Sequence, residues 1–213
     1  MVIATINDIL NSLLYGISQS LLIPVLIVLL AFFVYAMVHL GILLSDYYYR
    51  RKIKFDTKYL IDLVLSLADC NGSEEITQIV KESKLSDSHK GVLTTIINSS
   101  KLGRESRESL ARKMVEDEEI LAAKKLEKTD IIAKIAPAIG LMGTLIPLGP
   151  GLAALGTGDI QTLSQHLIIA FGAAVIGMAA AAIGFTISKI KRRWYEEEIS
   201  TLDTLAESIL ETL

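Results

Sequence analysis

The sequence predicts an all-α membrane protein with three transmembrane helices and a helical cytoplasmic domain. Hydrophobic residues make up 51% of the 213 residues, and they gather in three long runs that are almost free of lysine and arginine. Aromatic residues make up only 6%. An apolar excess of Leu, Ile, Val and Ala favours lipid-spanning helices over a membrane barrel, whose strands alternate and carry aromatic girdles.

The three apolar runs are each long enough to cross a bilayer. The first, residues 21–45, contains no Asp, Glu, Lys or Arg. At about 1.5 Å per residue, a helix of this length crosses a hydrocarbon core of about 30 Å. The second, residues 131–156, holds Lys134 near its start, where the side chain can extend to the interface. The third, residues 167–188, carries no charge. We predict one transmembrane helix over each run.

The basic residues predict the orientation, because Lys and Arg are retained on the cytoplasmic side. Residues 1–49 contain none, and a basic cluster follows the first run from Arg50 onward. A second cluster, within residues 189–193, follows the third run, whereas the connection 157–166 has no basic residue. We therefore expect a multi-pass protein of the cell membrane with its N-terminus outside, an outer loop over 157–166 and a cytoplasmic C-terminal helix over 189–213.

Residues 1–20 have apolar positions close to helical spacing. This pattern predicts an amphipathic helix that lies on the outer face of the membrane. The alternative is that the segment simply extends the first transmembrane helix.

Residues 46–130 have the composition of a soluble helical domain, with no proline and few glycines. Apolar spacing predicts helices over 56–68, 73–82 and 86–99, the first capped by Asp56 or Thr57. After Gly103 comes a strongly charged stretch with a narrow apolar stripe. We expect one long helix there that continues into the second span.

The chain lacks the common catalytic signatures. HExxH, P-loop and GxSxG patterns are absent, and the three histidines are dispersed without metal-ligand spacing. Cys70 is the only cysteine, so an intrachain disulfide is impossible. A formal charge of −3, with no stretch that interleaves basic residues with stacking aromatics, argues against nucleic acid. We expect neither an enzyme nor a cofactor-binding protein.

The second and third spans differ from the first because small residues recur in them about every four positions. They are Ala136, Gly140 and Thr144 in the second span, with Ala173, Gly177 and Ala181 as one row and Ala180 and Gly184 as another in the third. Such rows allow helices to approach closely in lipid. We expect them to support an oligomer; the alternative is a compact hairpin within one chain.

The second span also contains prolines, which cannot donate a backbone hydrogen bond. Pro147 frees the carbonyl of Gly143, and Pro150 frees that of Ile146. In lipid a freed carbonyl must face protein or water. Gly143 and Thr144 thus form a small polar patch near mid-membrane, unless the threonine hydroxyl bonds back to the carbonyl of Gly140.

The second and third spans resemble the proton-channel signature of the MotA/TolQ/ExbB family. The family pattern, roughly APxxGLxGTVxG, is matched by Ala136, Pro137, Gly140, Leu141, Gly143 and Thr144. The three spans and the large insert after the first are similar to ExbB and TolQ. Two positions depart from the pattern: Pro147 replaces a glycine, and the threonine of the last span falls on Ala173 or Ala174.

The resemblance implies a homopentamer around a central pore that holds the single transmembrane helices of an ExbD/TolR-like partner. It implies that protons, or sodium ions, flow through the complex to drive a motor, with a transmembrane Asp supplied by the partner. The implied proton path is lined by Thr144, Gly143, Gly140, Pro147, Ala173, Ala174 and Gly177. The residues expected to pack the helices together are Ala136, Ala181 and Gly184. The main competing interpretation is a membrane scaffold that assembles with partner helices without conducting ions.

Overall fold

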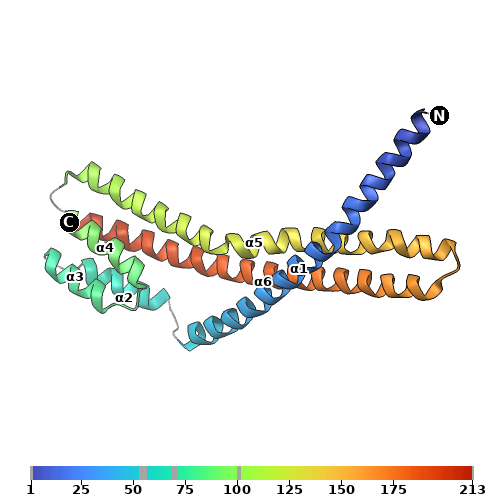
Figure 1. The fold of residues 1–213 in the computed structure, drawn as a ribbon. Helices are drawn as coiled ribbons and strands as arrows, with labels where there is room; N and C mark the ends of the chain where they lie inside the picture. Colours follow the sequence, from blue (N-terminus) through green and yellow to red (C-terminus); the bar gives the residue numbers. More distant parts are fainter. Residues whose placement is uncertain (1, 53–56, 69–71, 100–101, 213) are drawn as a thin grey trace. The chain divides into compact units, whose positions relative to one another are not determined.

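The computed structural model describes residues 2–52, 57–68, 72–99 and 102–212, and every regular element in them is a helix (Figure 1). The long helices are α1 (Val2–Lys52), α5 (Arg104–Gly156) and α6 (Ile160–Thr212). Three short helices lie between α1 and α5: α2 (Thr57–Ala68), α3 (Ser73–Glu82) and α4 (Asp87–Asn98). The predicted all-α class is therefore confirmed for the described residues.

The chain divides into two compact units, which are described separately. Met1–Leu44 and Glu127–Lys189 form one, here the apolar unit; Ser45–Leu126 and Ile190–Leu213 form the other, here the polar unit. The predicted long helix after Gly103 is confirmed, because α5 runs without interruption from Arg104 to Gly156.

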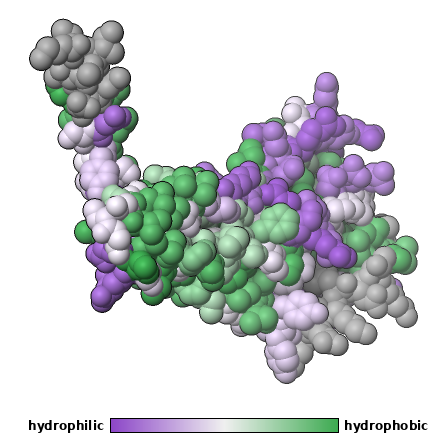
Figure 2. All heavy atoms as spheres, turned by 90° about the vertical axis from the view of Figure 1, so that its right-hand side faces the viewer, coloured by the Kyte–Doolittle hydropathy of each residue, from purple (hydrophilic) through white to green (hydrophobic). Residues whose placement is uncertain are grey.

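Three segments are long and apolar enough to cross a membrane. They lie within Ile9–Arg50, Arg104–Gly156 and Ile160–Thr212, which agrees with a multi-pass membrane protein. Many large apolar side chains of these helices are exposed, and they cover much of the face of the α5–α6 hairpin seen in Figure 2. This is the surface expected of helices whose surroundings are lipid or other helices and not water.

The N-terminal segment is part of α1 and not a separate helix. α1 is helical throughout Val2–Lys52, and Pro24 lies inside it, where the missing backbone N–H permits a kink without ending the helix. The place of residues 1–20 relative to the membrane stays a prediction.

The connection between α5 and α6 is shorter than the predicted outer loop of residues 157–166. Only residues 157–159 lie outside the helices. Gly158 has a positive φ of 79°, a left-handed conformation that glycine adopts without steric cost. The Asp159 carboxylate then accepts hydrogen bonds from the backbone N–H of Thr162 at 3.0 Å and from its hydroxyl at 2.5 Å. This N-terminal cap starts α6 at Ile160, several residues before the hydrophobic run begins.

The polar unit has a hydrophobic core formed by the short helices together with the C-terminal part of α6. The predicted helices over 73–82 and 86–99 correspond to α3 and α4, and that over 56–68 corresponds to α2. The largest fully buried side chains of the core are Leu67, Ile76, Leu93, Ile96, Ile97, Leu202, Leu205 and Ile209. Ser86 caps α4 by accepting a hydrogen bond from the backbone N–H of His89. Asp56, the proposed cap of α2, and Cys70 lie outside the described residues.

His89 is a buried histidine on α4 that lies close to the charged part of α5. Its side chain is only 7% exposed. Burial lowers the pKa of His89 below its ordinary value of 6.5; the negative charge of Glu118 opposes this effect, and the positive charge of Lys125 adds to it. The neighbouring Ser88 hydroxyl donates a hydrogen bond to Glu118. The folded unit therefore holds His89 mainly in its neutral form at neutral pH.

The polar unit is therefore expected to lose stability as the pH falls below the ordinary histidine value. Below pH 6.5 the unfolded chain binds a proton at His89 that the folded chain binds less readily, so acid favours unfolding. Thermal unfolding of the full chain, followed by circular dichroism from about pH 7.5 to about pH 5.5, should show a falling midpoint. His89→Gln should flatten this dependence. If the unfolding midpoint falls equally steeply with pH in the wild type and in His89→Gln, His89 is not the cause of the pH dependence.

Candidate functional site

The backbones of α5 and α6 approach each other closely in the apolar unit at two glycines. A Cβ atom on Gly177 would lie 2.9 Å from the carbonyl oxygen of Ala136 and 2.9 Å from the Cα of Gly140. A Cβ on Gly140 would lie 3.2 Å from the Cα of Gly177. Because real Cβ atoms do not approach backbone this closely, only glycine fits at Gly177. The small-residue row therefore brings the two helices of one chain into backbone contact.

Two further small residues extend this contact along the hairpin. A Cβ on Gly143 would lie 2.7 Å from the Cβ of Ala173. A Cβ on Gly184 would lie 3.2 Å from the carbonyl oxygen of Thr129, towards the start of the second predicted span. The helices thus touch over several turns.

A buried cluster adds α1 to the hairpin. Its members are Ile132, Ala136, Ala180 and Ala181, against which Phe32, Phe33 and Tyr35 of α1 pack. Of the residues expected to pack helices, Ala136 is fully buried, Ala181 is 9% exposed and Gly184 is buried. The structure thus uses all three within one chain, as the compact-hairpin alternative requires.

The seven residues implied to line a proton path fall into two groups. The buried group, held against helices of the same chain, consists of Gly140, Gly143, Pro147, Ala173 and Gly177. Thr144 and Ala174 are partly exposed. A side chain or backbone enclosed between helices of one subunit does not line a pore between subunits. Of these seven residues, Thr144 and Ala174 keep exposed surface within the single chain. Their assignment to a proton path stays a prediction.

The hydroxyl of Thr144 donates a hydrogen bond to the carbonyl oxygen of Leu141 at 2.7 Å. The sequence had suggested the carbonyl of Gly140 as the acceptor of such a bond. Bonding to the residue three positions back, and not four, is equally compatible with a helix. The hydroxyl oxygen retains lone pairs that can accept a hydrogen bond from water or from a protonated acid.

One of the proline-freed carbonyls has a partner from α1. The side-chain amide of Gln19 donates to the carbonyl oxygen of Ile146 at 3.3 Å. This is the carbonyl that Pro150 leaves without an intrahelical donor. Sequence reasoning identified the freed carbonyl but missed Gln19, although a lone amide beside a long apolar run was the available signal.

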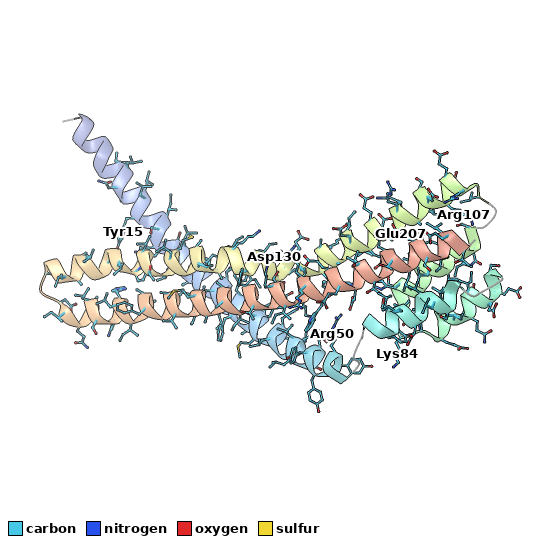
Figure 3. The ribbon with its side chains drawn as sticks, turned by 180° about the vertical axis from the view of Figure 1, so that it is seen from behind. Tyr15, Arg50, Lys84, Arg107, Asp130 and Glu207 are labelled. Atoms are coloured by element: carbon cyan, nitrogen blue, oxygen red, sulfur yellow. The ribbon has the colours of Figure 1, made fainter. Side chains whose placement is uncertain are left out.

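A polar pair joins α5 and α6 at the inner end of the predicted spans. Asp130 of α5 (Figure 3) accepts a hydrogen bond from the hydroxyl of Ser188 on α6. Ser188 is 4% exposed, and the neighbouring Thr129 is equally buried. The sequence does not predict this pair, since the proximity of Asp130 and Ser188 depends on the register of the two helices.

The histidines of the apolar unit do not form a metal site. His39 stacks on Tyr35 with 3.8 Å between ring centroids, and its Nδ1 lies 3.0 Å from the carbonyl oxygen of Tyr35. His166 packs against Gly151. Among the described residues, no group of three or more His, Cys, Asp or Glu side chains is arranged to hold a metal ion.

Comparison with known proteins agrees with this arrangement. The model of the MotA/TolQ/ExbB proton channel family matches residues 75–204, which is more than half of the chain and includes the whole α5–α6 hairpin of the apolar unit. No curated protein matches the chain. The matched segment holds Thr144, the proline-freed carbonyls and the glycine contact described above. The chain therefore belongs to the MotA/TolQ/ExbB proton channel family.

Proposed function

We propose that this chain is the ion-conducting channel subunit of a motor complex driven by the proton-motive force. The family match over both helices of the hairpin is the observation that carries the proposal. The subunit assembles as a homopentamer around a central pore in the cell membrane, with its N-terminus outside and its C-terminus in the cytoplasm. Protons are the coupling ion, and sodium is the alternative.

The path along α5 uses the Thr144 hydroxyl, a partly exposed polar group near mid-membrane. The Ile146 carbonyl is bonded to Gln19, and Asp130 is bonded to Ser188 about 21 Å from Thr144 along the helix, so these groups are satisfied within the subunit. The Thr144 hydroxyl offers a hydrogen bond to water or to a passing ion without placing a charge inside the bilayer.

The acid that carries the ion at mid-membrane comes from a partner. Residues 131–156 and 167–188 contain no Asp or Glu. Ionisable groups within membranes are costly and persist mainly where they take part in transport. We therefore assign this role to an aspartate on the single transmembrane helix of an ExbD/TolR-like protein that occupies the pore.

The exposed apolar surface supports assembly. Large side chains on α5 and α6 remain uncovered, with exposed fractions of 59% for Leu141 and Leu145, 68% for Phe171 and 61% for Val175. The glycine rows already join the helices of one chain. We therefore expect these larger residues to make the contacts between subunits. The pentamer is thus held by interdigitating Leu, Phe and Val side chains beside the contribution of lipid.

Ion flux should depend on the partner. Liposomes that contain the chain alone are expected to conduct no more than empty liposomes under a proton gradient, as reported by an entrapped pH-sensitive dye. Co-reconstitution with a single-span ExbD/TolR-like protein should create flux, and changing that protein's transmembrane aspartate to asparagine should remove it. The same series with a sodium gradient identifies the coupling ion.

Full conduction by the chain alone would contradict the assignment of the acid to the partner. If the complete complex conducts neither ion, the proposal of a channel subunit is wrong, and the chain is a scaffold that assembles with partner helices without conducting ions. One observation favours that second function: five of the seven implied path residues are buried within the subunit, and the Thr144 hydroxyl is bonded to its own helix.

A further inference from the structure

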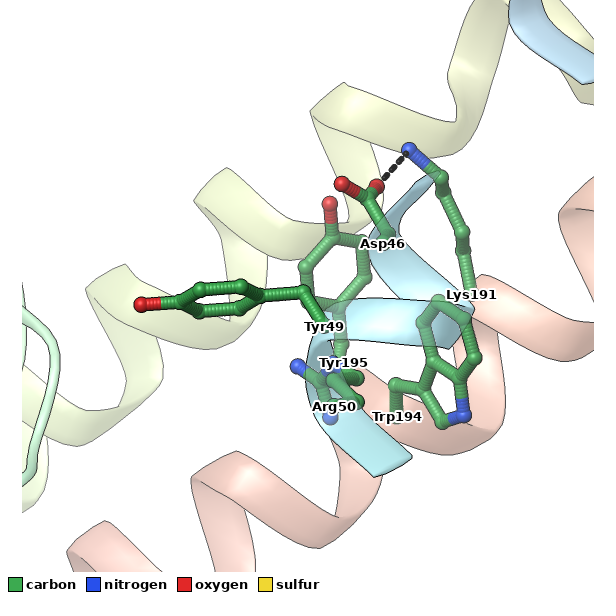
Figure 4. Close-up of a pocket in the computed structure, with 6 residues that line it drawn as sticks. All are labelled: Asp46, Tyr49, Arg50, Lys191, Trp194 and Tyr195. Carbon is green, nitrogen blue, oxygen red and sulfur yellow. Dashed lines mark ion pairs between the residues drawn. The ribbon is translucent and has the colours of Figure 1, made fainter. Parts of the chain in front are cut away.

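A cavity of about 240 Å³ lies within the polar unit, between the end of α1 and α6 (Figure 4). The lining side chains are Asp46, Tyr49 and Arg50 from α1 with Lys191, Trp194 and Tyr195 from α6. The cavity is smaller than the roughly 300–1,000 Å³ usual for sites that enclose a whole small molecule. It is therefore suited to one polar group and not to an entire lipid or metabolite.

The position of the cavity along the chain places it in the headgroup layer of a membrane. Asp46 and Arg50 directly follow the first apolar run, and Lys191 and Trp194 directly follow the third. Tyrosine and tryptophan at such positions are typical of the membrane–water interface. In a bilayer, the groups that reach this depth are phospholipid headgroups and water.

The charges of the cavity form two ion pairs. Lys191 Nζ lies 3.1 Å from one carboxylate oxygen of Asp46, and Asp46 remains 44% exposed. Arg50 forms an ion pair with Glu198, and its guanidinium lies over the ring of Trp194 at 4.8 Å from the centroid. With two acids and two bases, the site has no net charge to attract an anion or a cation alone. A zwitterion suits it, because its two charges can each join one of the ion pairs.

We infer that this cavity binds the zwitterionic headgroup of an ethanolamine phospholipid. The guanidinium of Arg50 donates to the phosphate, because guanidinium groups match phosphate oxygens in geometry and charge. The free oxygen of Asp46 accepts from the ammonium group, which also gains from the aromatic faces of the lining residues. The acyl chains then extend along the apolar part of α1.

The inference is tested by lipid retention. The full chain is placed in nanodiscs with equal amounts of phosphatidylethanolamine and phosphatidylglycerol, extracted in mild detergent, and analysed by native mass spectrometry. The wild type should retain phosphatidylethanolamine preferentially. Arg50→Gln should lower retention on the order of tenfold, the effect of losing a charge-assisted hydrogen bond. Asp46→Asn should remove the preference for phosphatidylethanolamine over phosphatidylglycerol.

Arg193→Gln is the matched control, since Arg193 lies in the same basic segment of α6 and pairs with Glu197 at 2.9 Å but does not line the cavity. Retention should remain at the wild-type level in this variant. Equal losses in Arg50→Gln and Arg193→Gln would overturn the proposal, as would an unchanged lipid preference in Asp46→Asn. Displacement of the lipid by inorganic phosphate would also overturn the proposal, because phosphate has no ammonium group for the Asp46 carboxylate to bind.

A paired variant separates recognition from folding. Arg50→Glu combined with Glu198→Arg restores the ion pair with reversed polarity. This protein should keep the wild-type unfolding midpoint and still lose the retained phosphatidylethanolamine. Full retention by the reversed pair would show that the cavity contacts serve only to hold α1 to α6.

Discussion

Gly177→Leu is expected to separate α5 from α6 and to prevent the apolar unit from folding. The new Cβ alone would lie 2.9 Å from a backbone oxygen and 2.9 Å from a backbone Cα, neither of which can rotate away. Overpacking of a well-packed core typically costs about 1–3 kcal/mol, and a leucine forced into backbone contact should reach or exceed the upper end. Unfolding of the full chain in a lipid–detergent mixture, followed by circular dichroism, measures the loss.

Gly172→Leu is the matched control on the same helix, because a Cβ on Gly172 meets no atom within 4 Å. It should fold like the wild type. Similar stability of the two variants would refute the close contact of α5 with α6 at Gly177. Since the contact lies within one chain, the Gly177 variant tests the folding of the subunit and not its assembly.

Thr144→Val should lower partner-dependent ion flux about tenfold, because a hydrogen bond to a charged group contributes roughly 1.5–3 kcal/mol. Valine has nearly the same shape as threonine and removes only the hydroxyl, which is partly exposed and donates to Leu141. Flux is measured in liposomes that contain the chain with its partner, and the mass of the complex in mild detergent shows whether the oligomer persists.

Thr186→Val provides the reference for this measurement. Its hydroxyl also bonds to its own helix, donating to Ala182 at 2.8 Å, but it lies near the inner end of α6. Flux should be unaffected in this variant. If both valine variants conduct equally well, the hydroxyl of Thr144 has no part in the path.

The helices and their approximate ends could be predicted because hydrophobic runs, charge and turn residues are local signals. The ends of α3 agree with the predicted residues 73–82. The start of α6 was placed too late because the Asp159 cap extends a helix beyond its apolar run. On α2, the apolar positions Ile61 and Leu65 are exposed, while Leu63 and Leu67 are buried. Which apolar side chains face the core depends on the neighbouring helices, which no local pattern specifies.

The candidate site was predicted in composition but not in arrangement. Small residues at Gly140 and Gly177 indicate close packing equally well for two helices of one chain and for two subunits. Their assignment to one chain follows only from the register of α5 against α6. The pair Asp130–Ser188 depends on the same register and spans 58 positions of sequence. The pair Gln19–Ile146 depends on the register of α1 against α5 and spans 127 positions.

The glycine contacts differ in how they can evolve. At Gly177 the obstructing atoms belong to the backbone of Ala136 and Gly140, so removing a neighbouring side chain makes no room there. At Gly143 the obstruction is the Cβ of Ala173, which a change to glycine would remove. Ala173→Gly is therefore expected to suppress the effect of Gly143→Ala, whereas truncation of a neighbouring side chain offers no such suppressor for a Gly177 variant.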